Sequence, residues 1–406
     1  MSYKNLVCTG CSCLCDDIGV EQEGDVITRV ENACRKGAAF IYAHNINERR
    51  NPPCLVKGER GDLTEALDTA TQLLRQAKKP LIFGLDNSTL EAQARAIELS
   101  RTLGATIDDC SSFCQGTVVE NILTGTLPSC SFPQLKEADL LVYWGSNPYH
   151  SHPRHISRFA YYPFERAKPA GLSCVDVRDT ELSRRCRHAF RLLPGEDRDF
   201  IISILTVIKE DSGREDARAF VELLKKSQFP IIFVGLGLTY ALDGDFSLFQ
   251  QLIETIKNIL GIGLAVIPMA CHTNMRGLNH LLYQQTGHVN KISFANGISH
   301  GPQFSFLEQV RNQEADCILI VGTDPYSSLP ASLAKNLNRG ISLITLDPYI
   351  TPTSMHSTVV FGGAISGIEA GGRVVRMDGT EVTLSPIKET DRPSDEEIIS
   401  RLLEGV

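Results

Sequence analysis

Three apolar segments of this chain occur twice, in the same order along the sequence. The first copies are KKPLIFGLDNST (78–89), EADLLVYWGSNPY (137–149) and GLSCVDVRDTE (171–181), and the second copies are QFPIIFVGLGLT (228–239), EADCILIVGTDPY (314–326) and GISLITLDPYI (340–350). One such match arises easily by chance, whereas three in the same order indicate an internal repeat. Two related halves are therefore the strongest constraint on the fold.

The repeated segments predict buried parallel strands. Continuous apolar runs are typical of strands that are covered on both faces, and amphipathic stretches such as 90–103 and 246–260 alternate with them. This alternation predicts an α/β fold with two related Rossmann-like parallel-sheet domains. The expected domains are 1–55 for a small N-terminal β domain, 56–210 with 330–406 for the first α/β domain, and 211–329 for the second.

Small and polar residues gather where the predicted strands end. Ligands of parallel sheets bind outside the carboxyl ends of the strands. Glycine there lets phosphates approach the backbone, and Asn or Asp accepts hydrogen bonds from sugar or base edges. The candidate binding residues are Gly145, Ser146, Asn147, Asp176, Arg178, Gly235, Gly237, Asn274, Gly322, Thr323, Asp324 and Asp347. They predict two similar nucleotide-like ligands, or one ligand between the halves; alternatively, they only cap strands and begin helices.

Charge and hydropathy narrow the class of protein further. The formal charge of −8 and the pI near 5.7 come without a basic tract, which argues against nucleic acid or an anionic membrane as a partner. No apolar run approaches the roughly 18 residues that a membrane-spanning helix needs, and the start of the chain lacks a signal-peptide core. We therefore expect a cytoplasmic protein that binds neither nucleic acid nor membrane.

The cysteine spacing at the N-terminus indicates a metal centre rather than disulfides. Cys8, Cys11 and Cys15 follow a C-x2-C-x3-C spacing, and Cys34 returns after a predicted hairpin. A tight loop plus one distant residue can place four thiolates around a [4Fe-4S] cluster. A zinc ribbon is the competing interpretation, but zinc ribbons favour two paired C-x2-C knuckles. Cys13 could substitute for a neighbour, and we treat it as a spectator.

Two hairpins and a capped helix are also predicted. The alternating stretch 18–30 predicts the hairpin that precedes the fourth cysteine. A second hairpin is expected over 366–386, around Asp378 and Gly379, because Asp-Gly between alternating segments is a strong turn signal. Ser394, followed by acidic residues, predicts the start of a final helix.

Several of these motifs together resemble a known family. They are the cysteine start with CRKG at 34–37, Cys114 with Gly116 after it, YWGSNPYHSHPRH (143–155) and the duplicated halves. The combination is similar to the molybdenum or tungsten bis-pterin oxidoreductases of the formate dehydrogenase type. Within them it is most similar to the B subunits of formylmethanofuran dehydrogenase from methanogenic archaea. The likeness covers nearly the whole chain.

The resemblance implies reversible reduction of CO2 to formate, the first step of methanogenesis from CO2. The metal would be tungsten or molybdenum held by two molybdopterin guanine dinucleotides, and the [4Fe-4S] cluster would supply the electrons. By position, Cys114 would be the thiolate ligand of this metal, and Arg276 would be the active-site arginine. Lys36, otherwise a solvated surface charge, would lie between cluster and pterin.

One position departs from the family pattern. A histidine often follows the metal-binding cysteine in the family, and here that position is Gln115, whose amide cannot carry a proton near pH 7. Either another residue carries the proton, with His272 or His288 as candidates, or the match slips at this loop. In the second case Cys110 replaces Cys114 as the ligand. We place His272 with Cys114 and Arg276 in the expected catalytic set.

The resemblance also implies partners and leaves alternatives. The partners would be an amidohydrolase-type subunit that condenses formate with methanofuran, and ferredoxin-type subunits that supply electrons. We expect the C-terminal β-barrel of the superfamily to be absent from this chain and to come from a separate small subunit. The alternatives are a non-catalytic relic, relay or scaffold subunit of a formyltransferase-type complex, and a simple nucleotide-binding module. The last alternative leaves the cysteine start unexplained and lacks a G-x-G-x-x-G fingerprint.

Overall fold

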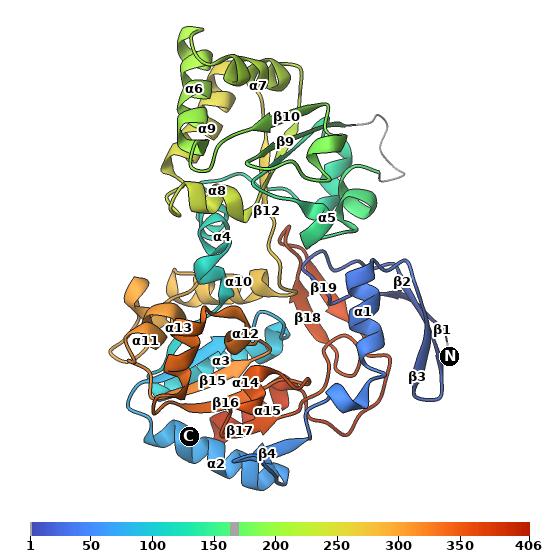
Figure 1. The fold of residues 1–406 in the computed structure, drawn as a ribbon, viewed down its shortest axis with the longest axis vertical. Helices are drawn as coiled ribbons and strands as arrows, with labels where there is room; N and C mark the ends of the chain where they lie inside the picture. The colour runs from blue at the N-terminus through green and yellow to red at the C-terminus, as the bar shows by residue number, and fades with distance from the viewer. Residues whose placement is uncertain (1, 163–169) are drawn as a thin grey trace. The chain divides into compact units, whose positions relative to one another are not determined.

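The computed structural model describes residues 2–162 and 170–406, which fold into two compact units. The first unit comprises Met1–Ser112, His272–Arg376 and Glu381–Val406, and the second comprises Phe113–Cys271 and Met377–Thr380. In Figure 1 the first unit is drawn in blue and in orange to red, because both ends of the chain contribute to it. The second unit is drawn mainly in teal to yellow.

A mixed sheet organises the first unit. Its strands are β4 (Cys54–Val56), β5 (Glu59–Arg60), β6 (Pro80–Gly84), β7 (Thr106–Asp108), β13 (Ile292–Ser293), β14 (Ser299–His300), β15 (Cys317–Val321), β16 (Ser342–Leu346) and β17 (Val359–Phe361). Among the described residues their order is β14-β13-β7-β6-β15-β16-β17-β4-β5. The strands from β7 to β17 run parallel. On either side of them β13 pairs antiparallel with β7, and β4 pairs antiparallel with β17. The continuous apolar runs thus occupy the buried centre, as expected.

The following helices belong to the first unit. They are α1 (Arg35–Ala43), α2 (Leu63–Gln76), α3 (Leu90–Leu103), α10 (Met275–Thr286), α11 (Phe306–Arg311), α12 (Pro325–Ser328), α13 (Ala331–Ala334), α14 (Pro352–Met355) and α15 (Asp395–Gly405). The predicted helix over 90–103 is confirmed, because Thr89 caps its first turn and Gly104 ends it in the left-handed conformation. The final helix is confirmed too, with Ser394 and Glu397 forming a capping box. Helix α15 packs against α2 and α3.

The second unit contains a parallel sheet. Its strands are β8 (Leu140–Trp144), β9 (Gly171–Asp176), β10 (His188–Arg191), β11 (Pro230–Val234) and β12 (Ala265–Pro268). Within the described part of the chain their order is β10-β9-β8-β11-β12, and all neighbours are parallel. Aromatic rings pack tightly on this sheet, with Trp144 in edge contact with Phe200, Phe220 and Phe249. Burial of these large rings contributes to the stability of this unit.

The helices of the second unit are short. They are α4 (Gly116–Leu123), α5 (Pro148–Ser151), α6 (Asp197–Glu210), α7 (Glu215–Lys225), α8 (Leu236–Ala241) and α9 (Ser247–Thr255). The helix predicted over 246–260 is α9, continued by a π-helical turn over Ile256–Leu260. Among all described residues, no helix has both the length and the apolar character needed to cross a membrane.

The two sheets share a strand order, but the chain builds them differently. The series β7-β6-β15-β16-β17 in the first unit corresponds to β12-β11-β8-β9-β10 in the second. The repeated segments are therefore equivalent strands, which confirms two related parallel sheets. In the first unit the β6–β7 pair precedes the other three strands along the chain, whereas in the second the equivalent pair comes last. The two arrangements are circular permutations of each other.

This permutation corrects the predicted domain boundaries. The prediction joined 56–210 to 330–406 and separated 211–329. In the structure β8 pairs with β11, so the sheet of the second unit draws on both predicted α/β domains. The predicted division at residue 55 also differs, because β4 already pairs with β17. Parallel strands need not be neighbours in sequence, and so similarity identified equivalent strands but not their sheet partners.

The repeated Glu-Ala-Asp tripeptide has the same structural task in both units. The carboxylate of Asp139 accepts the backbone N–H groups of Gln228 and Phe229, which lead into β11. The carboxylate of Asp316 accepts those of Lys78 and Lys79, which lead into β6. Each aspartate thus ties the start of its own strand to the start of the adjacent parallel strand.

A small antiparallel sheet stands at the N-terminus of the first unit. It contains β1 (Ser2–Leu6), β2 (Ile18–Glu23) and β3 (Val26–Glu31), and this order confirms the predicted hairpin before the fourth cysteine. The second predicted hairpin is confirmed as β18 (Gly372–Val375) and β19 (Glu381–Leu384). Leu14 packs against Val374 and Leu384 of that hairpin. The cysteine loop therefore belongs to the first unit and is anchored to its C-terminal part.

Candidate functional site

The N-terminal cysteines form a compact loop beside the start of α1. Cys8, Cys11 and Cys15 are buried, and Cys34 is half-buried as the N-cap of that helix. The loop closes because the backbone N–H of Cys8 donates to the carbonyl of Cys15 at 2.8 Å. The structure thus places the distant fourth cysteine beside the loop, as the spacing predicted.

Glycines around the sulfur atoms fit this loop to a cluster. The Gly37 N–H donates to Cys34 Sγ at 3.3 Å, and the Gly10 N–H donates to Cys8 Sγ at 3.4 Å. A Cβ on Gly37 would lie 2.8 Å from Cys8 Sγ and 3.7 Å from Cys34 Sγ. Backbone N–H donors, and glycines without a side chain beside the thiolates, suit an iron–sulfur cluster, whose sulfurs accept such hydrogen bonds. These residues fit a [4Fe-4S] group, and they do not by themselves exclude zinc.

Cys13 is fully buried among the other cysteines. A hydrogen bond with Cys13 lowers the pKa of Cys11 to about 7, whereas burial raises the pKa of Cys8 to about 12. Cys13 therefore lies within hydrogen-bond distance of a candidate ligand, and its spectator role stays a prediction. Lys36 lies exposed on α1. Its positive charge acts to lower the pKa of both Cys8 and Cys11, but at Cys8 the effect of burial is larger.

A direct hydrogen bond links the cysteine loop to the strand-end edge of the first sheet. The hydroxyl of Thr273 donates to the carbonyl of Thr9 in the loop. The next residue, Asn274, donates its backbone N–H to the carbonyl of Asp86 at 2.7 Å, just after β6. The cysteine loop, residues 272–274 and the turn that follows β6 thus form one connected structure.

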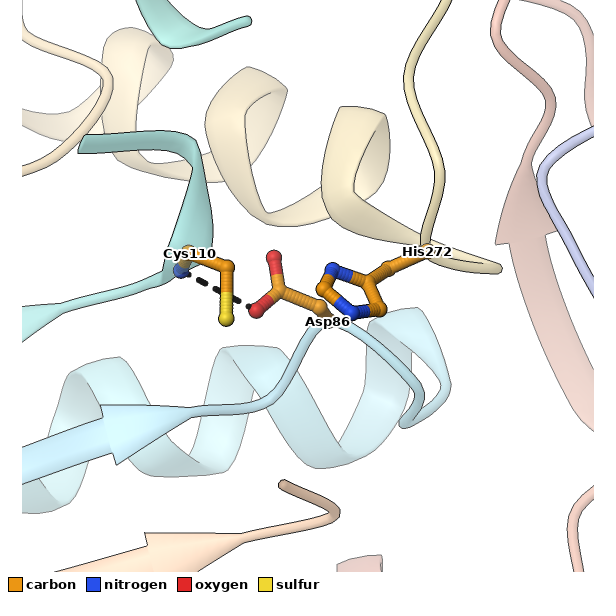
Figure 2. A group of neighbouring side chains, drawn as sticks. All are labelled: Asp86, Cys110 and His272. Carbon is orange, nitrogen blue, oxygen red and sulfur yellow. Dashed lines mark hydrogen bonds between the residues drawn. The ribbon is translucent and has the colours of Figure 1, made fainter. Parts of the chain in front are cut away.

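Three potential ligand side chains meet at this edge. One ligand atom each of Asp86, Cys110 and His272 lies within 4.8 Å of the others. Figure 2 shows the Asp86 carboxylate between the Cys110 side chain and the His272 imidazole, which come from three separate segments. The Cys110 N–H donates to the Asp86 carboxylate at 3.2 Å. Asp86 and Cys110 are buried, and His272 is half-buried. We call these three residues the Asp86 cluster.

The carboxyl groups of Asp108 and Asp109 lie next to the Asp86 cluster. Burial, together with the charges of Asp86 and Asp108, raises the pKa of Asp109 well above its ordinary value. Burial also raises the pKa of Asp108 to about 7, although Phe306 and other donors bond to it. Burial and the charges of Asp86 and Asp109 raise the pKa of the Cys110 thiol.

The expected histidines lie at opposite ends of α10. His272 precedes the helix and belongs to the Asp86 cluster. His288 follows it and stacks on His300 with ring centroids 4.1 Å apart. Of the two proton carriers predicted, the structure therefore brings only His272 to Cys110.

Arg276 lies buried in the first turn of α10. Its Nε donates to His280 Nε2 at 3.0 Å. Burial, with the charge of Arg276, lowers the pKa of His280 to about 4, so His280 is a neutral acceptor near pH 7. Asn274, predicted to bind a cofactor, uses both ends of its amide within the protein: it donates to the Ser88 carbonyl and accepts from the Val375 N–H. It thus positions the site rather than presenting a free amide.

Cys114 and Gln115 belong to the second unit, at the start of α4. Cys114 is half-buried, and Gln115 is fully buried. Within the described residues neither amide atom of Gln115 has a hydrogen-bond partner. Such a buried, unsatisfied amide is rare in folded proteins and fits a residue that faces a bound polar group. This observation supports a ligand beside Cys114 and does not identify it.

Glycines at the strand ends of the second unit pack backbone against backbone. A Cβ on Gly235 would lie 2.1 Å from the Gly145 carbonyl oxygen, and a Cβ on Gly237 would lie 2.9 Å from the Gly145 Cα. These glycines are therefore required by their mutual contact, whether or not a phosphate approaches them. Ser146 beside them is buried.

The polar strand-end residues are partly engaged within the protein. In the second unit Asn147 donates to Glu181, and Asp176 accepts from the exposed Arg178 backbone. In the first unit Asp324 is the N-cap of α12 and accepts hydrogen bonds from Thr353 and Ser327. Asp347 is buried beside the Tyr349 N–H, and Gly322 and Thr323 lie half-buried after β15. Capping therefore accounts for part of this set, and a ligand role stays a prediction.

Asp86 was not among the predicted site residues. The segment GLDNST places it just after a repeated strand, as GATIDDC places Cys110 just after the next strand. Ends of adjacent parallel strands meet at one edge of the sheet. Applied to the sequence, this rule could have predicted that Asp86 lies beside Cys110.

Full-length similarity to curated proteins supports the resemblance. No protein-family model matches the chain. Two relatives are the B subunits of tungsten-containing formylmethanofuran dehydrogenase 2 from Methanocaldococcus jannaschii and Methanococcus maripaludis. The chain is 28% identical to the M. jannaschii protein, covering 99% of this chain and 98% of that protein. It is 27% identical to the M. maripaludis protein, covering 100% of this chain and 98% of that protein.

Solved structures share the fold. A chain of the formyltransferase/hydrolase complex from Methylorubrum extorquens, determined with methylofuran, superposes with a TM-score of 0.69 at 18% identity and covers 86% of this chain and 98% of that chain. Acetylene hydratase from Pelobacter acetylenicus superposes with a TM-score of 0.75 at 13% identity, covering 99% of this chain and 69% of that chain. At these identities the likeness concerns the α/β fold with parallel sheets.

Proposed function

We propose that this chain is the redox subunit of a formylmethanofuran dehydrogenase-type complex and reduces CO2 to formate reversibly. The observation that carries the proposal is the hydrogen bond from Thr273 to the Thr9 carbonyl. It joins the cysteine loop to the edge of the first sheet where ligands of parallel sheets bind. An electron carrier at the loop would therefore adjoin a substrate or cofactor site. The full-length similarity to two B subunits supports the same conclusion.

The proposed cofactors are inferred from the side chains that could bind them. Cys8, Cys11, Cys15 and Cys34 would hold a [4Fe-4S] cluster, and Cys114 would be the protein thiolate on tungsten or molybdenum. Two molybdopterin guanine dinucleotides would complete the second centre, with the strand-end residues of both sheets and Lys36 as candidate contacts. The bound metal centre would supply the two-electron chemistry: CO2, two electrons and one proton give formate.

The residues of the chain would bind, orient and exchange protons. The buried guanidinium of Arg276 is held by His280 and matches a carboxylate, so it would orient formate and stabilise its developing charge. His272, next to Asp86, would carry the proton. Gln115 has a buried amide without a protein partner and would donate a hydrogen bond to a group bound beside Cys114.

The proposal includes partners and a location. An amidohydrolase-type subunit would take the formate, ferredoxin-type subunits would deliver electrons, and a small β-barrel subunit would cover the pterins. The complex would reside in the cytoplasm and bind neither nucleic acid nor membrane.

Metal analysis and activity of the native complex test this proposal. We expect iron, together with tungsten or molybdenum, and formate oxidation with a viologen dye as electron acceptor. Cys114→Ser should abolish the activity and release the heavy metal, whereas Cys110→Ser should retain tungsten or molybdenum. Iron without either heavy metal would refute the catalytic proposal, and the opposite behaviour of the two variants would move the ligand to Cys110.

A non-catalytic scaffold or relay subunit is the second candidate. The observation that favours it is the fold shared with a chain of the formyltransferase/hydrolase complex, together with glutamine at position 115. Such a subunit would assemble with its partners, lack tungsten and molybdenum, and leave formyl transfer unaffected when Cys114 is replaced by serine. The metal analysis above therefore distinguishes the two candidates.

A further inference from the structure

We propose that Asp86, Cys110 and His272 form a binding site for a divalent transition-metal ion of the zinc class. The site lies wholly in the first unit and is additional to the cluster and to the tungsten or molybdenum centre of the proposed function. It does not rest on that function, although the two share His272: a metal ion bound to this imidazole would exclude it as the proton carrier.

The donor set suits zinc. Carboxylate, thiolate and imidazole are ligands that zinc takes together, and three protein ligands with one open position are typical of its reactive sites. Hard cations such as Mg²⁺ and Ca²⁺ prefer oxygen donors alone. Ligand atoms around tetrahedral zinc stand about 3.5 Å apart. The three ligand atoms lie within 4.8 Å of one another, so small side-chain movements would close the site.

Charge balance favours a divalent ion. Ionised Asp86 and Cys110 with a neutral His272 carry two negative charges, which a divalent cation neutralises. In a buried site two unpaired negative charges are costly.

The three ligands are held in place by hydrogen bonds between their segments. The Cys110 N–H donates to the Asp86 carboxylate, and the Asn274 N–H donates to the Asp86 carbonyl. The Asn274 side chain donates to the carbonyl of Ser88 in the same turn. These contacts keep the residues that follow His272 close to Asp86. A preorganised ligand set loses less conformational entropy when it binds.

An unsatisfied oxygen points to a missing partner. Within the described residues Asp86 Oδ1 is buried and has no hydrogen-bond partner, and Asp86 as a whole is 1% exposed. Next to Asp86 lies Asp109, which accepts hydrogen bonds from Asn279 and Ser111. Carboxylates and amides in this position typically orient metal ligands. A cation would satisfy Asp86 Oδ1, and a water in the open position would have its pKa lowered to about 7.

Cobalt substitution tests the site, since thiolate-bound Co²⁺ shows a charge-transfer band in the near ultraviolet. The full chain, with its cysteine loop loaded with iron and sulfide and other metals removed, is titrated with Co²⁺. We expect one ion per chain with the thiolate band. Cys110→Ser should lose the band, and His272→Ala and Asp86→Asn should each weaken binding by at least about 100-fold. Cys54→Ala, at another buried cysteine of the same unit, should bind as the wild type does.

Three outcomes would overturn the proposal. One is that wild type and Cys110→Ser show the same cobalt spectrum. Another is that the iron-loaded chain takes up no cobalt. The third is that Cys110→Ser loses tungsten or molybdenum, which would make Cys110 the ligand of that metal. If Cys110→Ser does not fold, the affinities of the other two variants decide the question. Loss of tungsten from Cys114→Ser bears only on the proposed function, so the two proposals fail separately.

Discussion

At the scale of single residues, His155 shows how a buried side chain can make stability depend on pH. It is fully buried in the second unit, and neither ring nitrogen has a hydrogen-bond partner within the described residues. Its ring contacts Phe132, Tyr143 and Phe233. Burial, with nearby His152, lowers the pKa of His155 to about 3. The folded chain therefore keeps this imidazole neutral.

Replacement of His155 by phenylalanine should reduce acid destabilisation. Between pH 6.5 and pH 3 the unfolded chain binds a proton at His155 that the folded chain does not bind, so stability falls as pH decreases through this range. At pH 5 this loss is about 2 kcal/mol. We expect His155→Phe to remove about that much of the difference in unfolding free energy between pH 7 and pH 5, measured by urea denaturation. His188→Phe, at an exposed position, is the control, and an equal pH response in both variants would contradict the prediction.

Gly84 illustrates a backbone contact that excludes any side chain. It ends β6 with φ at +100°, and a Cβ there would lie 2.3 Å from the carbonyl oxygen of Val321. Gly58 has a similar φ of +84°, but a Cβ there would meet nothing within 4 Å. The two glycines therefore separate conformational strain from steric overlap.

Alanine at position 84 should cost more than alanine at position 58. Both substitutions incur the strain of a left-handed residue, about 1–2 kcal/mol, and Gly84→Ala adds overlap worth about 1–3 kcal/mol. The difference in unfolding free energy between the two variants, from urea denaturation, should therefore be about 1–3 kcal/mol. Equal losses would mean that β6 and β15 can separate without cost at their ends.

At the scale of elements, the two aspartates of the Glu-Ala-Asp repeat connect neighbouring strands. Burial acts to raise the pKa of Asp139, but its hydrogen bonds from Ser227, Gln228 and Phe229 outweigh it and lower that pKa. The ionised form is therefore the one that holds the strand start. Asp316 makes the equivalent pair of bonds in the first unit.

Asparagine at either aspartate should weaken its sheet. Asn provides one acceptor oxygen and no charge, so Asp139→Asn and Asp316→Asn should each lose about 1–2 kcal/mol of unfolding free energy. The exposed Glu137 of the same tripeptide serves as a control, because Glu137→Gln should change stability by less than about 0.5 kcal/mol. Urea denaturation at pH 7 measures all three, and a loss at Glu137 equal to that at Asp139 would contradict the assigned role.

At the scale of the whole molecule, the N-terminal and C-terminal parts of the chain both belong to the first unit, and residues between them form most of the second. The first sheet therefore depends on strands from both sides of the second unit, such as β6 and β15. The cysteine loop adds a further long-range connection, because Thr9 bonds to both Ser366 and Thr273. Loss of order in the loop should consequently increase the mobility of parts of the first unit that are distant in sequence.

Removal of iron should loosen the first unit selectively. If the four cysteines hold a cluster, its loss frees the loop and weakens the bonds that Thr9 makes. We expect faster amide hydrogen exchange over 5–40 and 270–276 in the iron-free chain, with β8 and β11 unchanged. Hydrogen-exchange mass spectrometry of the loaded and iron-free chain measures this. Uniformly faster exchange would indicate global destabilisation, and no change over 270–276 would contradict the connection through Thr9.

The sequence alone determined the local elements of this protein, and it predicted a metal centre at its first cysteines. The boundaries of α3, the start of α15 and the two hairpins followed from caps, turns and periodicity, because those signals act over a few residues. The equivalent strands were also recognisable from their repeated apolar runs.

Only the tertiary structure decided which strands share a sheet and which polar residues meet. The permuted order, which places β8 beside β11 and β6 beside β15, depends on long-range pairing that no local pattern encodes. Asp86, Cys110 and His272 are likewise far apart in sequence, and they meet because adjacent strands end at one edge and residues 272–274 bond to it. Convergence of this kind is a property of packing, which only the folded chain contains.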